Sequence, residues 1–244
     1  MWLTFDGILN ARDLGGLPAA DGRHVKPGRL LRGAGLASAS DADLERLQEL
    51  KLRHIVDFRD TGECERRPDR PVKGAEYHNL PALPALPGRP TLRDGEPEFG
   101  PLFARIYGQM AVTEESAAAY REFFRILLSC PDGAVYFHCT QGKDRTGIGG
   151  ILALTALGVP MEDVQADYFL SNTGLKEAME HPESPGAANW SRQTKESLFF
   201  VFQETLDVYL NRLAEDWGGV EGYLRGRLGL TDADFARLRS DYLE

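Results

Sequence analysis

The chain has 244 residues, of which 42% are hydrophobic, and a formal net charge of −9 with a pI near 5.2. This length and apolar content predict one globular α/β domain that covers residues 1–244. The acidic balance argues against a general nucleic-acid or membrane-surface binder, because such proteins present a broad basic face.

The three cysteines, Cys64, Cys130 and Cys139, show no Cys-x-x-Cys spacing. A disulfide framework or a zinc site is therefore not indicated, and we expect a reduced, cytoplasmic setting. The N-terminus lacks a basic start followed by an apolar run, and no stretch of 18 or more apolar residues occurs. We expect neither a signal peptide nor a stable membrane insertion.

The first forty residues are rich in glycine and in turn dipeptides such as Gly15-Gly16, which predicts small strands and tight turns. A helix is expected from Ser40 to Lys51, because Ser40 and Asp43 resemble a capping box and leucines follow at helical spacing. The apolar, β-branched run at 52–58 then predicts a buried strand.

Two segments are predicted to be irregular. Residues 81–100 contain prolines at positions 81, 84, 87, 90 and 97, which are incompatible with a regular element. Residues 171–191 are polar and contain both proline and glycine. We expect these two segments to form lid-like flaps, because long loops in compact domains often serve function.

The remaining elements are read from apolar spacing. It predicts a buried strand at 134–138 and helices at 113–130, 147–157, 160–170 and 194–213, with a last short helix capped by Thr231 and Asp234. The alternation of strands and helices indicates an α/β fold with a central, mostly parallel sheet flanked by helices.

The segment from His138 to Gly147 reads HCTQGKDRTG and joins the predicted strand at 134–138 to a helix. Such a loop offers inward-pointing N–H groups and the positive end of a helix dipole, which together bind an anion. Cys139 would lie beneath a bound phosphate, while Arg145, six residues later, grips two of its oxygens. The same groups favour thiolate over thiol, so Cys139 is the candidate nucleophile of a cysteinyl-phosphate mechanism.

The other residues of this loop have supporting roles. Gly142 suits a tight turn with positive φ, and Lys143 would add a second cation at the mouth of the site. Thr146 could hydrogen-bond the thiolate, and His138 is expected to brace the loop through its ring nitrogens. The candidate phosphate-binding positions are Thr140, Gln141, Gly142, Lys143, Asp144 and Arg145.

At these residues the sequence resembles the protein tyrosine phosphatase superfamily, in particular its bacterial and fungal branch with the loop His-Cys-x-x-Gly-Lys-Asp-Arg-Thr-Gly. Three further segments, 10–16, 29–33 and 55–60, resemble the N-terminal signature of that branch, although Gly33 stands where the family often has serine. A weaker match lies at 167–172 and 223–230. The resemblance therefore spans nearly the whole chain.

The resemblance implies a tyrosine phosphatase whose range can extend to phosphoserine, phosphothreonine and phosphoinositides. The expected partner is thus a phosphorylated protein or a phosphoinositide. Lys143 matches a lysine that the family shares with phosphoinositide phosphatases. Thr140, however, replaces an additional lysine of some lipid phosphatases, which weakens a strict phosphoinositide interpretation.

The proton donor to the leaving group is left open between two aspartates, because the sequence has no Trp-Pro-Asp motif. The resemblance favours Asp144 in the loop, whose alternative role is a salt bridge to Arg145 or Lys143. Asp57 ends the strand predicted at 52–58, where side chains reach the crevice at the carboxyl ends of strands. It could orient Arg145 or serve as the acid itself.

Other charged and sulfur-containing residues are expected to be structural. Asp13 should join Arg12 in an ion pair near the loop. Arg59 could reach a phosphate or be a solvated surface charge, and Cys64 and Cys130 should be buried or inert thiols.

The predicted activity is phosphomonoester hydrolysis without a metal or another cofactor. The alternative functions are a phosphoinositide phosphatase, a phosphate-binding adaptor that has lost catalysis, and a sulfurtransferase. The joint presence of Cys139, Asp144 and Arg145 argues against the adaptor, and Arg145 with Thr146 suits phosphate chemistry better than persulfide transfer.

Overall fold

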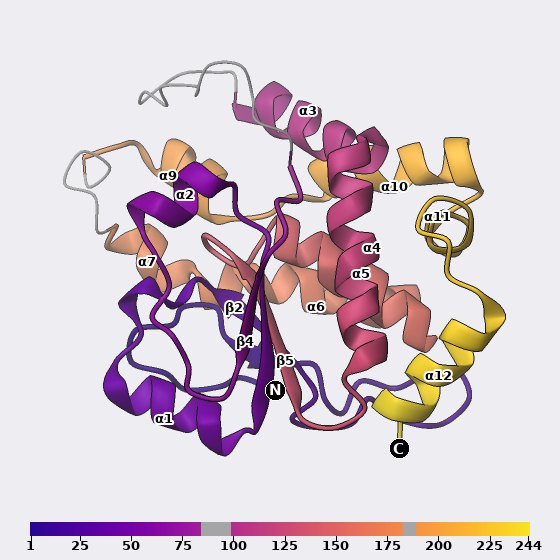
Figure 1. Ribbon diagram of the computed structural model, residues 1–244. Coiled ribbons are helices and arrows are strands. Elements are labelled where there is room, and N and C mark those ends of the chain that lie inside the picture. The colour runs from indigo at the N-terminus through magenta and orange to yellow at the C-terminus, as the bar shows by residue number, and fades with distance from the viewer. Residues whose placement is uncertain (84–98, 183–188) are drawn as a thin grey trace.

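A central five-stranded sheet organises the chain in the computed structural model, which describes residues 1–83, 99–182 and 189–244 (Figure 1). Its strands are β1 (Arg12–Asp13), β2 (Leu30–Ala34), β3 (Leu52–Asp57), β4 (Glu76–Asn79) and β5 (Ala134–Cys139). They lie in the order β1-β2-β5-β3-β4. Only the edge pair β1 and β2 is antiparallel, so the predicted mostly parallel sheet is confirmed.

Helices cover both faces of the sheet (Figure 1). They are α1 (Asp41–Glu49), α2 (Thr61–Arg66), α3 (Phe99–Val112), α4 (Glu114–Ser129), α5 (Arg145–Leu157), α6 (Met161–Gly174), α7 (Lys176–Glu180), α9 (Arg192–Phe199), α10 (Gln203–Trp217), α11 (Val220–Gly226) and α12 (Asp232–Tyr242). No helix in the described ranges is both long and apolar enough to cross a membrane.

Alternation along the strands divides the core into two layers. In β5, Val135 and Phe137 pack with the aromatic side chains of α4 and with α5. Tyr136, between them, joins the opposite cluster, which includes Leu47 of α1 and Ile55 of β3. Because β5 is buried on both faces and lies between β2 and β3, its carboxyl end is held firmly from both sides.

The helix-capping residues predicted at Ser40 and Thr231 are confirmed. The Ser40 side chain accepts from the amide of Asp43, and the Asp43 carboxylate accepts from the amide of Ser40, which is a complete capping box at α1. Thr231 and Asp234 form the same arrangement at α12. The strand predicted at 52–58 and the helix predicted at 113–130 correspond to β3 and α4.

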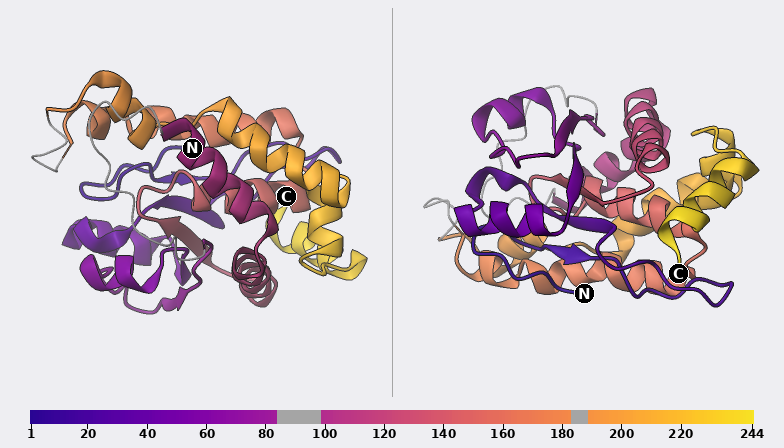
Figure 2. Two further views of the ribbon diagram at one scale, coloured as in Figure 1. Left: turned by 90° about the horizontal axis from the view of Figure 1, so that it is seen from above. Right: turned by 60° about the horizontal axis from the view of Figure 1, so that its bottom comes forward.

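The prediction for residues 81–100 is only partly testable, since residues 84–98 lie outside the described residues. The segment that follows them forms α3, a helix that the sequence analysis did not predict. This helix packs along α10 (Figure 2), and Gly108 of α3 faces Val208 of α10. Tertiary packing therefore stabilises a helix whose glycines and proline obscured it in the sequence.

The prediction of an irregular segment at 171–191 is wrong for its first part, because α6 continues to Gly174 and α7 follows. The polar residues there make buried contacts: Asn172 donates to the carbonyl of Val201 and accepts from its amide. The same contact explains why the helix predicted at 194–213 is two helices. The chain is extended around Val201, between α9 and α10. Residues 183–188 lie outside the described residues.

Candidate active site

The loop 140–144 leaves the carboxyl end of the central strand β5 and enters α5 at Arg145. This is the crevice of an open α/β sheet in which ligands commonly bind. Cys139 ends the strand with its side chain only 2% exposed. The nucleophile candidate therefore lies at the base of the loop rather than on the surface.

The carbonyl groups of the loop point outward. Those of Gln141 and Gly142 each accept from the side-chain amide of Asn10 at 3.1 Å, and that of Thr140 accepts from the amide of Gly35 at 3.3 Å. In a trans peptide the N–H points opposite to the C=O. The amides of residues 141–143 thus face the interior of the loop, as an anion-binding nest requires.

A buried ion-pair network holds the loop from the side of the N-terminal signature. Asp167 of α6 lies 2.7 Å from both Arg12 Nε and Arg32 Nη1. Arg32 Nη2 also donates to the carbonyl of Gly142, and Arg12 Nη1 donates to Asn10 Oδ1. The charges of the two arginines hold the pKa of Asp167 below its usual value, although burial alone would raise it. The network therefore fixes the outward carbonyls of the loop.

Two glycines allow the phosphatase loop to lie close to strand β2. Gly142 has a φ of +69°, and a Cβ there would lie 2.1 Å from the carbonyl oxygen of Gly33. At Gly33 itself, a Cβ would lie 2.4 Å from the hydroxyl of Tyr136, which donates to the carbonyl of Ala34. The position of the Tyr136 hydroxyl thus favours glycine over a residue with a side chain at position 33.

Arg145 is oriented by Glu63 of α2, a residue that the sequence analysis did not single out. The Glu63 carboxylate accepts from Nη1 at 2.5 Å, from Nη2 at 2.9 Å and from the hydroxyl of Thr140 at 2.7 Å. Burial alone would raise the pKa of Glu63, but the hydrogen bonds and charge of Arg145 lower it. Within the described residues, the hydrogen bonds of Arg145 use its two Nη atoms and leave the Nε edge for a phosphate.

Asp57 lies against Arg59, and Glu63 takes the place beside Arg145 that the sequence analysis gave to Asp57. The fully buried Asp57 carboxylate accepts from Arg59 Nε and Nη2 and, at 2.7 Å, from the hydroxyl of Tyr77. Burial would raise its pKa, but His138, Arg59 and Tyr77 lower it to about 2. Asp57 is therefore ionised at neutral pH.

Arg59 is not a solvated surface charge, because it is only 3% exposed and lies between Asp57 and Asp69. His138 completes this cluster: its Nε2 lies 3.0 Å from Asp69 and its Nδ1 lies 3.1 Å from the carbonyl of Cys139. Burial opposes protonation of His138, but Asp69 and Asp57 raise its pKa above the ordinary value. The ring thus contacts the backbone of Cys139 from behind the loop.

Asp57, Asp69 and His138 also bring three potential metal ligands within 4.8 Å of one another. The guanidinium of Arg59 already neutralises both carboxylates, at 2.6 and 3.0 Å. A cation that replaced it would leave a buried arginine unpaired. The donor set therefore fits an ion-pair network better than a metal site.

Asp144 contacts residues on the rim of the loop. Its Oδ1 accepts from the hydroxyl of Tyr107 at 2.8 Å, and that hydroxyl lies 2.6 Å from the hydroxyl of Tyr168. The other oxygen lies 3.6 Å from Lys143 Nζ. The side chain remains 21% exposed, so Asp144 is oriented by the Tyr107 hydroxyl and stays partly open to solvent.

Lys143 is not an exposed cation at the mouth of the site, because it is only 2% exposed. Its ammonium group donates to the carbonyl of Phe200 and lies 4.8 Å from the ring centroid of Phe103. Burial lowers the pKa of Lys143, and the nearby charge of Asp144 opposes this shift. The amine is thus covered by α3 and by the segment between α9 and α10.

Thr146 and Asp13 complete the set of predicted residues. The hydroxyl oxygen of Thr146 is buried, and no residue in the described ranges hydrogen-bonds to it, so it is free for another acceptor. Asp13 does not pair with Arg12. Its carboxylate accepts from the amides of Gly15 and Gly28 and so closes turns of the N-terminal segment.

The prediction that Cys64 and Cys130 are inert agrees with their surroundings. Burial raises the pKa of both thiols, and the charge of Asp57 adds to the effect at Cys64, whose pKa is about 11. Neither thiol is therefore activated as a nucleophile.

A buried cysteine at the end of a central parallel strand, amides that face the interior of the loop and an arginine six residues later are the features expected of a cysteine-dependent phosphatase. Comparison with known proteins gives the family. Residues 3–244 match the model of the tyrosine phosphatase family, and the chain belongs to that family. It is a protein-tyrosine phosphatase.

Two bacterial relatives match nearly the whole chain. A Cupriavidus necator protein, provisionally named a tyrosine-protein phosphatase, is 38% identical over 255 residues, which covers 99% of this chain and 88% of that protein. The triple specificity protein phosphatase PtpB of Mycobacterium tuberculosis is 26% identical and covers 96% of both chains. Among solved structures, that of a Pseudomonas aeruginosa TpbA variant in complex with phosphotyrosine superposes on this chain with a TM-score of 0.31 and 15% sequence identity. The comparison covers 78% of this chain and 89% of that one.

Proposed function

We propose that the chain hydrolyses phosphotyrosine through a covalent Cys139 phosphoenzyme, without a metal. The observation that carries this proposal is the geometry of the loop. The Cys139 side chain lies at the base of a nest of inward-facing amides, and Glu63 holds Arg145 so that its Nε edge remains for a phosphate. These groups act on the phosphoryl oxygens, where negative charge resides in the transition state.

In the first step the thiolate sulfur attacks phosphorus, and the bond between phosphorus and the tyrosyl oxygen breaks. A proton from Asp144 reaches that oxygen as it leaves. In the second step a water molecule attacks phosphorus and gives its proton to Asp144, and the P–S bond breaks to release the thiolate. The unpartnered hydroxyl of Thr146 supports the departing thiolate with a hydrogen bond.

The assignment of Asp144 rather than Asp57 as the acid follows from their surroundings. Asp57 has a pKa of about 2 and receives hydrogen bonds from Arg59 and Tyr77, so it holds no proton to donate at neutral pH. Asp144 belongs to the loop and is partly exposed. The hydrogen bond from Tyr107 orients its carboxyl group.

The substrate range of the proposal includes phosphoserine and phosphothreonine as well as phosphotyrosine. The relative named a triple specificity phosphatase supports this breadth. Phosphoinositide hydrolysis is a second and weaker candidate. Lys143, which the sequence analysis linked to inositol lipids, is buried against Phe200 and Asp144 and is not free to bind a second phosphate.

We further propose that residues 1–244 form one phosphatase domain, which the family match over residues 3–244 supports. A reducing compartment such as the cytoplasm suits this mechanism, because oxidation of Cys139 would remove the nucleophile.

A substrate panel tests the proposal. Turnover of a phosphotyrosine peptide, a phosphoserine peptide and a soluble phosphoinositide is measured in excess EDTA with purified full-length protein. We expect the phosphotyrosine peptide to give the highest kcat/KM, the phosphoserine peptide a lower but measurable one, and the phosphoinositide the lowest. Loss of all turnover in EDTA would contradict the metal-free mechanism, and a preference for the lipid would contradict the substrate class.

A further inference from the structure

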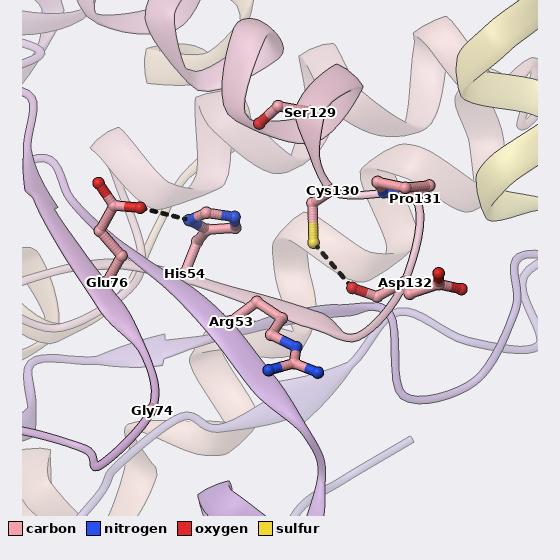
Figure 3. Close-up of a pocket in the computed structure, with 8 residues that line it drawn as sticks. All are labelled: Arg53, His54, Gly74, Glu76, Ser129, Cys130, Pro131 and Asp132. Carbon is pink, nitrogen blue, oxygen red and sulfur yellow. Dashed lines mark hydrogen bonds and ion pairs between the residues drawn. The ribbon is translucent and has the colours of Figure 1, made fainter.

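A second cluster of polar side chains lies on strands β3 and β4, outside the phosphatase loop. It consists of His54 of β3 with Glu76 and His78 of β4. The phosphatase mechanism uses none of these three residues. Figure 3 shows His54 and Glu76 pointing toward each other near the C-terminus of α4. Both residues line a hollow of about 300 Å³.

Strand register brings these three side chains together. β3 and β4 are parallel, with His54 beside Glu76 and Val56 beside His78. Since side chains alternate along a strand, Glu76 and His78 lie on the same face of the sheet as His54. Tyr77 points to the opposite face, where its hydroxyl donates to Asp57.

The three donor atoms converge as the ligands of one ion would. His54 Nδ1 lies 3.1 Å from His78 Nε2 and 3.8 Å from Glu76 Oε2. His78 Nε2 lies 3.9 Å from the same carboxylate oxygen. Zinc bonds of roughly 2.0–2.2 Å to nitrogen and oxygen correspond to edges of about 3.3–3.6 Å in a tetrahedral site. Shifts of a few tenths of an ångström would therefore complete three corners.

The chemistry of the donors also suits a transition-metal ion. Imidazole nitrogen with carboxylate oxygen is a donor set that zinc uses in proteins. The histidines are 17% and 21% exposed, whereas Glu76 is 69% exposed. The carboxylate side of the cluster is thus open to solvent, which could supply a fourth ligand.

We propose that His54, Glu76 and His78 bind one divalent transition-metal ion, with zinc as the best-suited candidate. The ion clamps the edge strand β4 to β3. Its role is structural, because all three ligands lie on the paired strands β3 and β4. The site is independent of the phosphatase proposal and supplies no group to the hydrolytic reaction.

Zinc binding is measured directly on the Cys139→Ser variant of the whole chain, so that the catalytic thiol cannot compete as a ligand. Metal is stripped with EDTA and the chelator removed, and zinc is then titrated in competition with a chromophoric chelator. We expect one equivalent to bind and the melting temperature to rise with the free zinc concentration. Cobalt should give the visible absorption of a tetrahedral or five-coordinate ion.

Variants assign the ligands. His54→Gln and His78→Gln should each lower zinc affinity by more than about 100-fold, since loss of a direct ligand exceeds the usual effect of losing a residue that only orients one. His181→Gln removes an exposed histidine elsewhere and is the matched control. Full affinity in both ligand variants, or no zinc bound by the parent protein, would overturn the proposal. The cluster would then be a histidine pair joined by one hydrogen bond.

Discussion

The contrast between Asp144 and Asp57 gives the sharpest prediction. Asp144→Asn keeps an oxygen that can accept the hydrogen bond from Tyr107, but it removes the proton that the leaving group needs. A positioned general acid contributes roughly 10²–10⁴-fold to rate, so kcat on an alkyl phosphate should fall by about that factor. On p-nitrophenyl phosphate the loss should be smaller, because that leaving group needs little protonation. Stability should change by less than about 1 kcal/mol.

Asp57→Asn should instead lower the stability of the protein and leave the acid catalysis intact. A pKa of about 2, against an ordinary value of 3.8, corresponds to about 2 kcal/mol of stability at neutral pH. The substitution also leaves Arg59, which is 3% exposed, with Asp69 as its remaining carboxylate partner. Breaking a buried ion pair costs roughly 3–5 kcal/mol, so the melting temperature should fall by about 10 °C.

Both variants are assayed below their melting temperatures against substrates whose leaving groups span a wide pKa range. The logarithm of kcat should depend more steeply on leaving-group pKa for Asp144→Asn than for the wild type. For Asp57→Asn the slope should match that of the wild type, with activity scaled by the folded fraction. A steeper slope for Asp57→Asn alone would refute the assignment and transfer the acid role to Asp57.

Three more predictions follow from the contacts of the site. Glu63→Gln should lower kcat/KM by about tenfold, because it removes the charge that orients Arg145; unchanged kinetics would show that phosphate alone orients the guanidinium. The stability contributed by Asp57 is present above pH 3.8 and lost as the pH falls toward 2, so urea unfolding of Asp57→Asn should show a flatter dependence across that range. At pH 7 a thiol alkylating reagent should label Cys139 before Cys64, whose pKa is about 11, and mass spectrometry that found the reverse order would contradict the site.

Much of the phosphatase loop and its setting could be predicted from the sequence, because the signals there are local. The apolar run before Cys139 forms a strand, the small-residue segment after Arg145 forms a helix, and Gly142 has the expected positive φ. The same holds for the capping boxes at Ser40 and Thr231. Each of these features depends on residues only a few positions apart.

The missed features depend on contacts between distant parts of the chain. Glu63 meets Arg145 across 82 positions, and Asn10 meets Gly142 across 132. No spacing rule links such pairs, although the proximity of Glu63 to the signature at 55–60 was a usable signal. Lys143 was predicted to lie at the mouth of the site, because nothing in the neighbouring sequence reveals that Phe103 and Phe200 cover it.

The central claim is that Cys139 forms the covalent intermediate, and trapping that intermediate tests it most directly. Wild-type protein is mixed with excess p-nitrophenyl phosphate and quenched within milliseconds, and its peptides are analysed by mass spectrometry, with Cys139→Ser as the control. We predict one phosphoryl group on the peptide that contains Cys139, and turnover by the serine variant lowered by at least about 10³-fold. A serine variant that turned over substrate at near the wild-type rate, or a phosphoryl group on another residue, would contradict the account.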